Sequence, residues 1–236
     1  MTTRTNELEG RHIAVTGGSG ALGGAVLEAL LERGAHCHVP CVEPEVPAYF
    51  ALASHERVSA TPAIDLAGEE STREYYRSLP NLWGSVHLAG GFAMAKLADT
   101  TRAELESMLD INLVTAFLCC REAVRSMRRG GAGGRIVNVA ARPVVRPQGG
   151  MAAYCCSKAA VAALTECLGE ELVGENILVN AILPSLIDTL ANRRAMPDAD
   201  HAAWPKPAEI AQTIAFLVGP SNVLTSGALV PVFGRG

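Results

Sequence analysis

Aromatic residues are scarce in this sequence, and their scarcity limits the kinds of core that it can build. Phe, Trp and Tyr make up 5% of the 236 residues, although hydrophobic residues reach 49%. The apolar content therefore comes mainly from Ala, Val, Leu and Ile, a composition typical of helices packed closely on a buried parallel sheet. A chain this long and apolar can bury a substantial core, so we expect a single domain over residues 1–236.

Cysteine pairs of the kind that form disulfides or bind metals are missing. The seven cysteines are an odd number, two pairs of them are adjacent, and no Cys-x-x-Cys occurs. The histidines supply no metal template either, because His36, His38 and His87 lie within or just before strand patterns at unsuitable spacings. We therefore predict buried or half-buried thiols in a reducing compartment, hydrogen-bonded structural histidines and no metal site.

Dense basic clusters and long apolar runs are also absent. The net charge is −4, and the short run Arg125-Ser-Met-Arg-Arg129 is better explained as a solvated helix end than as a nucleic-acid or membrane surface. No stretch approaches the ~18 uninterrupted apolar residues of a membrane span, and the N-terminus has no apolar signal segment. We expect a cytoplasmic protein with no nucleic-acid or membrane partner and with a flexible N-terminal segment at residues 1–9.

Strand-like and helical patterns alternate along the chain. The strand-like runs are short and mostly aliphatic, and they lie at 12–15, 37–42, 85–88, 135–139, 178–182 and 228–232. Helical patterns lie between most of them, at 21–33, 71–79, 102–129, 152–174 and 207–218. Thr101 with Glu104 forms a capping-box signal, and Pro207 suits a first helical turn. The alternation predicts an α/β fold, a doubly wound parallel β-sheet with helices on both faces.

A glycine-rich loop joins the first strand to the first helix. Gly18, Gly20 and Gly23 satisfy Gly-x-Gly-x-x-Gly. Glycines let the backbone turn tightly and approach a pyrophosphate, and the free N–H groups of a helix start favour its negative charge. A plain glycine-rich turn is the alternative, but the strand–loop–helix context favours nucleotide binding.

Tyr154 and Lys158 lie four residues apart in a helical pattern, which places a phenol and an ammonium on one face. A nearby cation favours the phenolate, so Tyr154 is a candidate general acid/base. Taken alone, the spacing is weak evidence and favours a surface helix pair. The interpretation therefore depends on the rest of the chain.

The glycine loop and Tyr154-x-x-x-Lys158, at this separation in a β-α chain of this length, resemble the short-chain dehydrogenase/reductase family over nearly the whole sequence. The resemblance implies a single Rossmann-like domain and a nicotinamide cofactor, NAD or NADP. The cofactor-binding residues that it implies are Thr16, Gly17, Gly18, Ser19, Gly20, Ala21, Leu22, Gly23, Asp65, Leu66, Ala89, Gly90, Tyr154, Lys158, Pro184, Ile187 and Thr189. Among the positions expected to contact the cofactor or adjoin those that do, three depart from the family's pattern, namely Ala21, Leu88 and Ser185, which stand where Gly, Asn and Gly are usual.

The resemblance also implies catalytic roles for Tyr154, Lys158 and Asn112. Tyr154 would give or take the proton, Lys158 would lower the pKa of the tyrosine and hold the nicotinamide ribose, and Asn112 would hold a water that leads to Lys158. Asn112 lies in an apolar stretch, where an amide is a poor helix former unless it has a partner. A buried Asn bonded to backbone is the alternative.

Ala141 is the most serious departure from the family, because it stands where the resemblance implies a catalytic Ser, thirteen residues before Tyr154. Loss of one hydroxyl donor at an oxyanion can cost on the order of 100- to 1000-fold in rate. Members of the family similar to dihydropteridine reductase share this absence and reduce a quinonoid pterin. Arg142, Gln148 and the hydroxyl of Ser185 are candidate replacements, and the sequence does not choose among them.

The resemblance thus implies an NAD(P)-dependent oxidoreductase that transfers a hydride between the nicotinamide and a small carbonyl, conjugated imine or quinonoid substrate. Two alternatives stay open: a nucleotide-binding or regulatory protein without redox turnover, and a non-redox cyclase or isomerase that reuses the pocket. The residue expected to read the ribose 2′ position falls near Cys41, with Glu43 two residues later. We favour NAD, since an acid there favours a free 2′-OH and no Arg or Lys lies in the glycine loop to meet a 2′-phosphate. Residues 188–206 are expected to form a substrate lid. A homodimer or homotetramer is implied.

Overall fold

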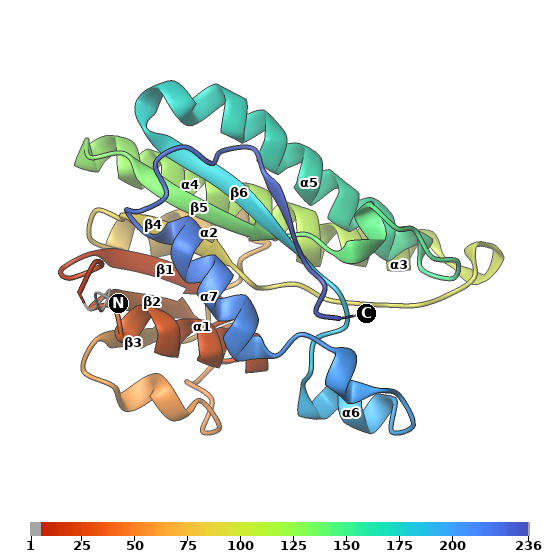
Figure 1. Ribbon diagram of the computed structural model, residues 1–236. Helices are drawn as coiled ribbons and strands as arrows, with labels where there is room; N and C mark the ends of the chain where they lie inside the picture. The colour runs from red at the N-terminus through yellow and green to blue at the C-terminus, as the bar shows by residue number, and fades with distance from the viewer. Residues whose placement is uncertain (1–5, 236) are drawn as a thin grey trace.

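The computed structural model describes residues 6–235 and contains one seven-stranded parallel sheet (Figure 1). Its strand order is β3-β2-β1-β4-β5-β6-β7, which is the order of a doubly wound sheet. The strands are β1 (His12–Thr16), β2 (His36–Pro40), β3 (Val58–Thr61), β4 (Gly84–His87), β5 (Gly134–Val139), β6 (Ile177–Pro184) and β7 (Leu229–Val232). The predicted Rossmann-like α/β class is confirmed.

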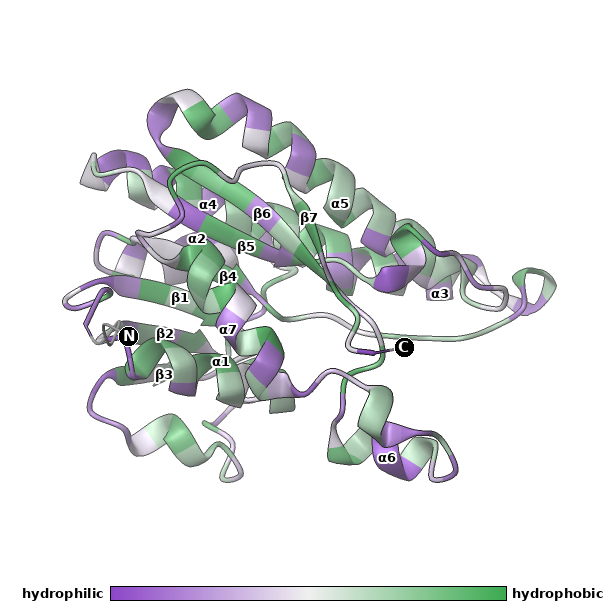
Figure 2. Ribbon diagram, viewed as in Figure 1, coloured by the Kyte–Doolittle hydropathy of each residue, from purple (hydrophilic) through white to green (hydrophobic). Residues whose placement is uncertain are grey.

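Helices cover both faces of the sheet (Figure 1). On one face α1 (Ala21–Leu31) packs against α7 (Pro207–Val218), and on the other α4 (Thr115–Gly130) lies between α2 (Glu69–Ser78) and α5 (Ala152–Leu172). Figure 2 shows hydrophobic residues concentrated along the strands and polar residues on the outer sides of the helices. The core is accordingly aliphatic, with Ile13, Val86 and Ile182 fully buried in the sheet.

Three elements differ from the sequence-based expectations. The edge strand β3 was not predicted, because its four residues Val-Ser-Ala-Thr carry little aliphatic signal. The single helix expected over 102–129 is α3 (Arg102–Leu109), a π-helical turn (Asp110–Val114) and α4. The segment expected as a lid contains a short helix, α6 (Leu190–Ala195). The predicted capping box is confirmed, since the Thr101 side chain accepts from the Glu104 amide and the Glu104 carboxylate accepts from the Thr101 amide.

Part of the expected flexible N-terminus is packed. Residues 1–5 lie outside the described residues, but the side chain of Leu8 is fully buried in the core. The Glu7 carboxylate accepts a hydrogen bond of 2.8 Å from Ser221 Oγ and lies 3.4 Å from Arg33 Nε. Flexibility of residues 1–9 stays a prediction, and Leu8 is an apolar anchor that the sequence analysis did not identify.

Two of the three predicted histidines, His38 and His87, are hydrogen-bonded inside the sheet, whereas the His36 ring packs 5.2 Å from that of His12. His87 lies 2.8 Å from Ser85 Oγ through Nε2 and 2.8 Å from Asn138 Oδ1 through Nδ1, and burial lowers its pKa to about 4. His38 Nε2 lies 3.0 Å from His12 Nδ1, and burial lowers the pKa of His38 to about 4. Both rings are therefore neutral at pH 7 and are held by hydrogen bonds inside the sheet.

The cysteines are free thiols in two environments. Cys37, Cys41, Cys119 and Cys120 are buried, and Cys155 is half-buried. The other two, Cys156 and Cys167, are exposed on α5, which differs from the buried or half-buried setting expected for all seven. Within the described residues, the structure contains no helix with the length and apolarity of a membrane span and no cluster of three metal-ligating side chains.

Candidate active site

The glycine loop brings the backbone of β1 against the end of β4. Gly17 has φ +66°, and a Cβ there would lie 2.8 Å from the Ala89 nitrogen. A Cβ on Gly23 would lie 2.3 Å from the Gly17 oxygen. Both positions therefore require glycine. The loop is anchored by the Ala89 amide, which donates a 3.2 Å hydrogen bond to Thr16 Oγ1.

The start of α1 is open to an anion. Its N-cap residue is Gly20, no side chain caps it, and its first turn contains no acidic residue. The first N–H groups of a helix have no intrahelical acceptor, and the helix dipole adds a partial positive charge there. A glycine turn followed by this open helix start suits a dinucleotide pyrophosphate.

A cleft of roughly 630 Å³ extends from this loop along the ends of the strands. The predicted cofactor residues that line it are Gly17, Ser19, Asp65, Leu66, Ala89 and Gly90. Sequence analysis missed much of the opposite wall. It is supplied by α3, the π-helical turn and the first residue of α4, through Ala103, Glu106, Ser107, Asp110, Ile111 and Thr115. No local motif distinguishes that helix face, since it becomes a wall only through the tertiary fold. The predicted residues Thr16, Gly18, Gly20, Ala21, Leu22 and Gly23 shape the loop rather than line the cleft.

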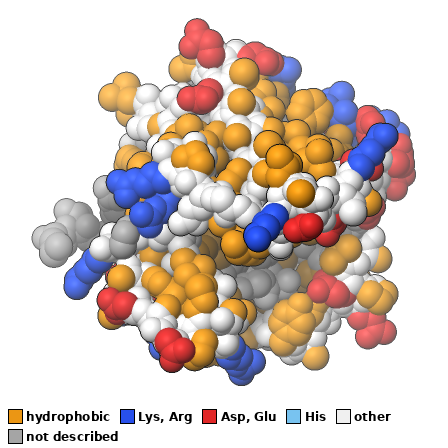
Figure 3. Space-filling model, turned by 90° about the vertical axis from the view of Figure 1, so that its right-hand side faces the viewer, with side chains coloured by type: hydrophobic (Ala, Val, Ile, Leu, Met, Phe, Trp, Pro, Cys, Tyr) orange, Lys and Arg blue, Asp and Glu red, His pale blue; other side chains and the backbone are white. Residues whose placement is uncertain are grey.

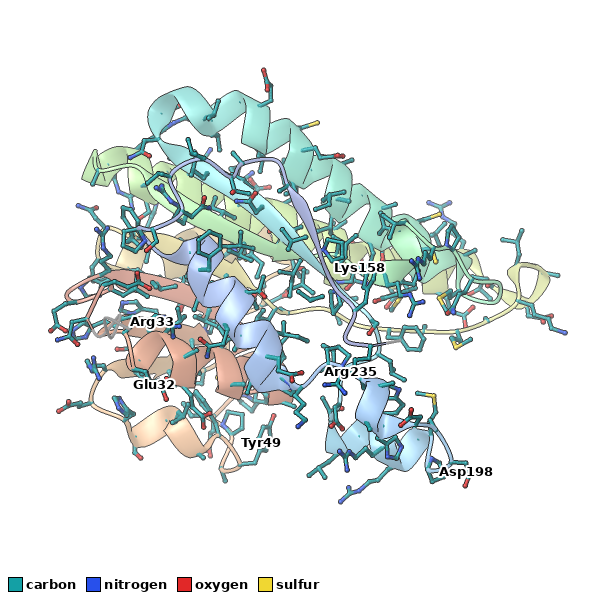
Figure 4. The ribbon with its side chains drawn as sticks, viewed as in Figure 1. Glu32, Arg33, Tyr49, Lys158, Asp198 and Arg235 are labelled. Carbon is teal, nitrogen blue, oxygen red and sulfur yellow. The ribbon has the colours of Figure 1, made fainter. Side chains whose placement is uncertain are left out.

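An acidic group lies where β2 enters the cleft. Glu43 lines the cleft together with Cys41 and Val42. The hydroxyl of Tyr49, whose position Figure 4 labels, donates a 3.1 Å hydrogen bond to Glu43 Oε1. A nearby loop therefore holds the carboxylate. The sequence pointed to Glu43, but Tyr49 was missed because it lies in an irregular loop.

Lys158 is buried at the same edge of the sheet (Figure 4). Its Nζ donates a 2.9 Å hydrogen bond to the Val139 carbonyl at the end of β5. Burial lowers the pKa of Lys158 to about 8, because the ammonium loses its hydration. A substantial fraction of the side chain is thus still charged near pH 7.

Tyr154 lies one helical turn before Lys158 on α5. Its ring packs edge-on against Phe92, with centroids 4.9 Å apart. Burial raises the pKa of Tyr154 to about 12, so the expected lowering by Lys158 is wrong for this structure. Loss of hydration is the main cause of the raised pKa, and the neighbouring Cys155 thiol adds to it. Tyr154 is therefore protonated at neutral pH and is suited to donate a proton.

Asn112 lies in the π-helical turn and is almost fully buried. Its Oδ1 accepts from the Gly91 amide at 3.0 Å, and its Nδ2 donates to the Gly91 carbonyl at 3.1 Å and to Ser157 Oγ at 3.1 Å. The structure thus has the backbone-bonded Asn that the sequence left open as the alternative. It also shows Ser157, which sequence analysis missed although a polar residue three positions after Tyr154 was a signal.

Gly90 is the point where these groups meet. A Cβ on Gly90 would lie 2.6 Å from Asn112 Oδ1 and 3.2 Å from Lys158 Nζ. Gly90 also lines the cleft. The structure therefore brings Asn112 and Lys158 together at the wall of the cleft, with Tyr154 one turn away.

The segment after β6 contributes the last predicted positions. Pro184 ends β6, the Ile187 carbonyl accepts from Asn192 Nδ2 at 2.8 Å, and Thr189 Oγ1 caps α6 by accepting from the Asn192 amide at 3.2 Å. These residues lie outside the lining of the cleft. Ala141 is buried just past the end of β5.

Comparisons with known proteins agree with this geometry. The sequence pattern described as short chain dehydrogenase matches residues 11–200. The chain is 30% identical to the rhamnolipids biosynthesis 3-oxoacyl-[acyl-carrier-protein] reductase of Pseudomonas aeruginosa, over 96% of each protein. It is 29% identical to a sorbitol dehydrogenase of Cereibacter sphaeroides, over 77% of this chain and 72% of that protein. A solved short-chain dehydrogenase/reductase of Serratia marcescens superposes with a TM-score of 0.86 at 29% identity, covering 97% of this chain and 98% of that one.

Proposed function

Because this chain belongs to the short-chain dehydrogenase family, we propose that it is a nicotinamide-dependent reductase of small carbonyl, conjugated imine or quinonoid substrates. That it is an NAD(P)-dependent oxidoreductase in general follows from its family. The observation that carries the finer proposal is the junction at Gly90, where the cleft meets Lys158 and Asn112.

In the proposed reaction a bound nicotinamide would supply a hydride to the carbonyl or imine-like carbon. Tyr154 donates its hydroxyl proton to the substrate heteroatom, a role that suits a phenol whose pKa is about 12. Lys158 stabilises the charge that develops on the tyrosine oxygen. Asn112 makes two hydrogen bonds to the backbone of Gly91. These bonds hold the segment with Gly90 and Gly91 beside Lys158.

The residues of the cleft fit the cofactor. Gly17 and Gly23 leave room that a Cβ would fill, and the uncapped start of α1 offers amides to a pyrophosphate. Lys158 would contact the nicotinamide ribose, and Pro184, Ile187 and Thr189 are proposed to close over the nicotinamide. Asp65 and Leu66 line the end of the cleft where the adenine is expected.

The test is turnover by the purified protein with NADH and NADPH on a panel of ketones, quinones and dihydropteridines. We expect oxidation of the reduced nicotinamide that depends on at least one panel member. Nucleotide binding without any turnover would favour a nucleotide-binding or regulatory protein, or a non-redox cyclase or isomerase, instead.

We propose NAD as the preferred cofactor, supported by Glu43 and its bond to Tyr49. A carboxylate there accepts from a free ribose 2′-OH and repels a 2′-phosphate. Glu43→Gln is expected to lower the NADH-to-NADPH ratio of kcat/KM about 10-fold. Glu45→Gln, an exposed neighbour in the same loop, is the matched control and should leave the ratio unchanged. If the NADH-to-NADPH ratio of kcat/KM is unchanged in Glu43→Gln, another residue determines the cofactor preference.

We propose that Ala141 occupies the place of the family's catalytic Ser, which leaves polarisation of the substrate oxygen weak. Ala141→Ser adds one oxygen to a buried position and should raise kcat for simple ketones about 10-fold. Ala140→Ser, the adjacent buried residue, is the control and should not raise it. A slower or unchanged Ala141→Ser enzyme would mean that another donor already fills the role.

Assembly into a homodimer or homotetramer and a cytoplasmic location are part of the proposal. Phe117 is half-exposed beside a groove of roughly 320 Å³ between α4 and α5, a surface that a second copy could cover. We further propose that residues 188–206, which include α6, act as the substrate lid. Light scattering of the purified protein tests the assembly.

A further inference from the structure

Two arginines share one aromatic ring just beyond β5. The guanidinium carbon of Arg142 lies 5.4 Å from the centre of the Phe233 ring, and that of Arg146 lies 5.7 Å from the same centre. The Arg146 amide donates a 3.0 Å hydrogen bond to the Arg142 carbonyl, so one helical turn sets both side chains beside the ring. This arginine pair was not distinguished by the sequence, because Phe233 is 87 residues beyond Arg146.

Neither member of the arginine pair has an acidic partner within residues 6–235, since no salt bridge or side-chain hydrogen bond involves Arg142 or Arg146 there. Other arginines of the chain do have one, as Arg128 has in Glu175 and Arg193 has in Asp188. Two cations beside one ring repel each other. An anion bound between them would remove that repulsion and occupy their donors.

The arginine pair lies at the catalytic edge of the sheet. Arg142 directly follows the buried Ala141. Three residues before Arg142, the Val139 carbonyl accepts a hydrogen bond from Lys158 Nζ. The turn that carries Arg142 packs against α5 and β6. Figure 3 views this side of the molecule, where hydrophobic side chains are widespread and Lys and Arg side chains are scattered among them.

Phe233 is fixed relative to the same site. Its carbonyl accepts a 2.8 Å hydrogen bond from Ser185 Oγ, in the segment proposed to close over the nicotinamide. This bond uses the single proton of the Ser185 hydroxyl, which removes Ser185 as a donor to substrate. Arg193 is likewise occupied, by two bonds of 2.5 and 2.8 Å to Asp188. Arg142 and Arg146 keep their donors.

We propose that the substrate is an oxo acid, whose carboxylate binds Arg142 and Arg146 while its carbonyl group lies at Tyr154. This substrate class rests on the proposed reductase function. In the reaction a C–H bond of the reduced nicotinamide breaks and its hydride forms a C–H bond at the carbonyl carbon, so the nicotinamide is oxidised and the carbonyl reduced. The Tyr154 proton passes to the carbonyl oxygen, and the carboxylate is unchanged.

The test compares acids with their neutral esters. Binding of acetoacetate and 4-oxopentanoate, each beside its methyl ester, is measured by calorimetry with NAD⁺ present, which cannot reduce them. Reduction of the four compounds with NADH is measured separately. At least one acid should bind about 10-fold or more tightly than its ester. In the Arg142→Ala/Arg146→Ala protein that preference should fall below about twofold, while Arg129→Ala, an exposed control on α4, keeps it.

The outcomes separate this inference from the proposed function. Equal binding of every acid and its ester by the unaltered protein, or a preference that survives in the double variant, would overturn the oxo-acid assignment even if the esters are reduced. Acid binding that depends on the arginine pair without reduction of any compound would support the anion site and contradict the reductase. The single variant Arg146→Ala changes only an exposed residue, so it is expected to fold even if the double variant does not. It should lose part of the preference for an acid over its ester.

Discussion

Tyr154→Phe is expected to lower kcat by about 1000-fold while leaving NADH binding within about twofold of the unaltered protein. The substitution removes only the hydroxyl that gives the proton, and it keeps the ring that packs edge-on against Phe92. Burial raises the pKa of Tyr154 to about 12, so the lost group is the protonated phenol throughout the neutral range. Steady-state kinetics at saturating cofactor, with nucleotide binding followed by fluorescence, checks both parts.

The matched control for this experiment is Tyr75→Phe. The Tyr75 hydroxyl is buried and has no hydrogen-bond partner within the described residues, so its removal should leave kcat unchanged. Full activity in Tyr154→Phe would show that another group supplies the proton.

Lys158→Met is expected to lower kcat by about 100-fold or more and, at the same time, to stabilise the fold at pH 7. Burial lowers the pKa of Lys158 to about 8 from the ordinary 10.5, so the folded state disfavours the ammonium. This pKa shift means that burying the charged ammonium costs the folded state roughly 3 kcal/mol, a cost that the variant removes. The variant also loses the hydrogen bond to the Val139 carbonyl, which offsets about 1 kcal/mol of that gain. We expect a net gain of about 1–2 kcal/mol in the free energy of unfolding.

The sign of the pH dependence identifies the cause. Between pH 8 and 10.5 the unfolded chain holds the Lys158 proton while the folded chain has lost it, so the cost of burying the ammonium fades as the pH rises. The stability advantage of Lys158→Met should therefore be largest below pH 8 and decline toward pH 10.5. Urea unfolding of both proteins at several pH values measures it, with the exposed Lys206→Met as control. If the stability advantage of Lys158→Met does not vary with pH, better packing of the Met side chain is its cause, and the explanation by a buried ammonium is wrong.

The sequence predicted the fold class because the β-α alternation and the glycine loop are local patterns. Six of the seven strands and the glycine loop follow directly from aliphatic runs and glycine spacing. The edge strand β3 is short and weakly apolar, and its pairing with β2 is decided by tertiary contacts. The π-helical turn at Asp110–Val114 interrupts an otherwise α-helical pattern. The amide of Asn112 indicated only that its side chain needs a hydrogen-bond partner there, not that the helix changes its geometry.

The site was predictable in its residues and less so in its chemistry. Spacing placed Tyr154 and Lys158 on one face, but the lost hydration that shifts both pKa values depends on burial, which no local pattern specifies. Contacts over long separations were also beyond reach, such as those of Arg142 and Arg146 with Phe233. Such contacts arise only when β5, β6 and the C-terminal segment meet at one edge of the sheet.

The central claim is that this protein passes a hydride from a nicotinamide to its substrate beside Tyr154. Reduction with NADH deuterated at C4, in separate samples for each of the two positions, tests it most directly by mass spectrometry of the product. One of the two samples should yield product with a single deuterium on the reduced carbon, and the other should yield none. Product without deuterium in both samples, or no product from any compound of the panel while NADH binds, would contradict the claim.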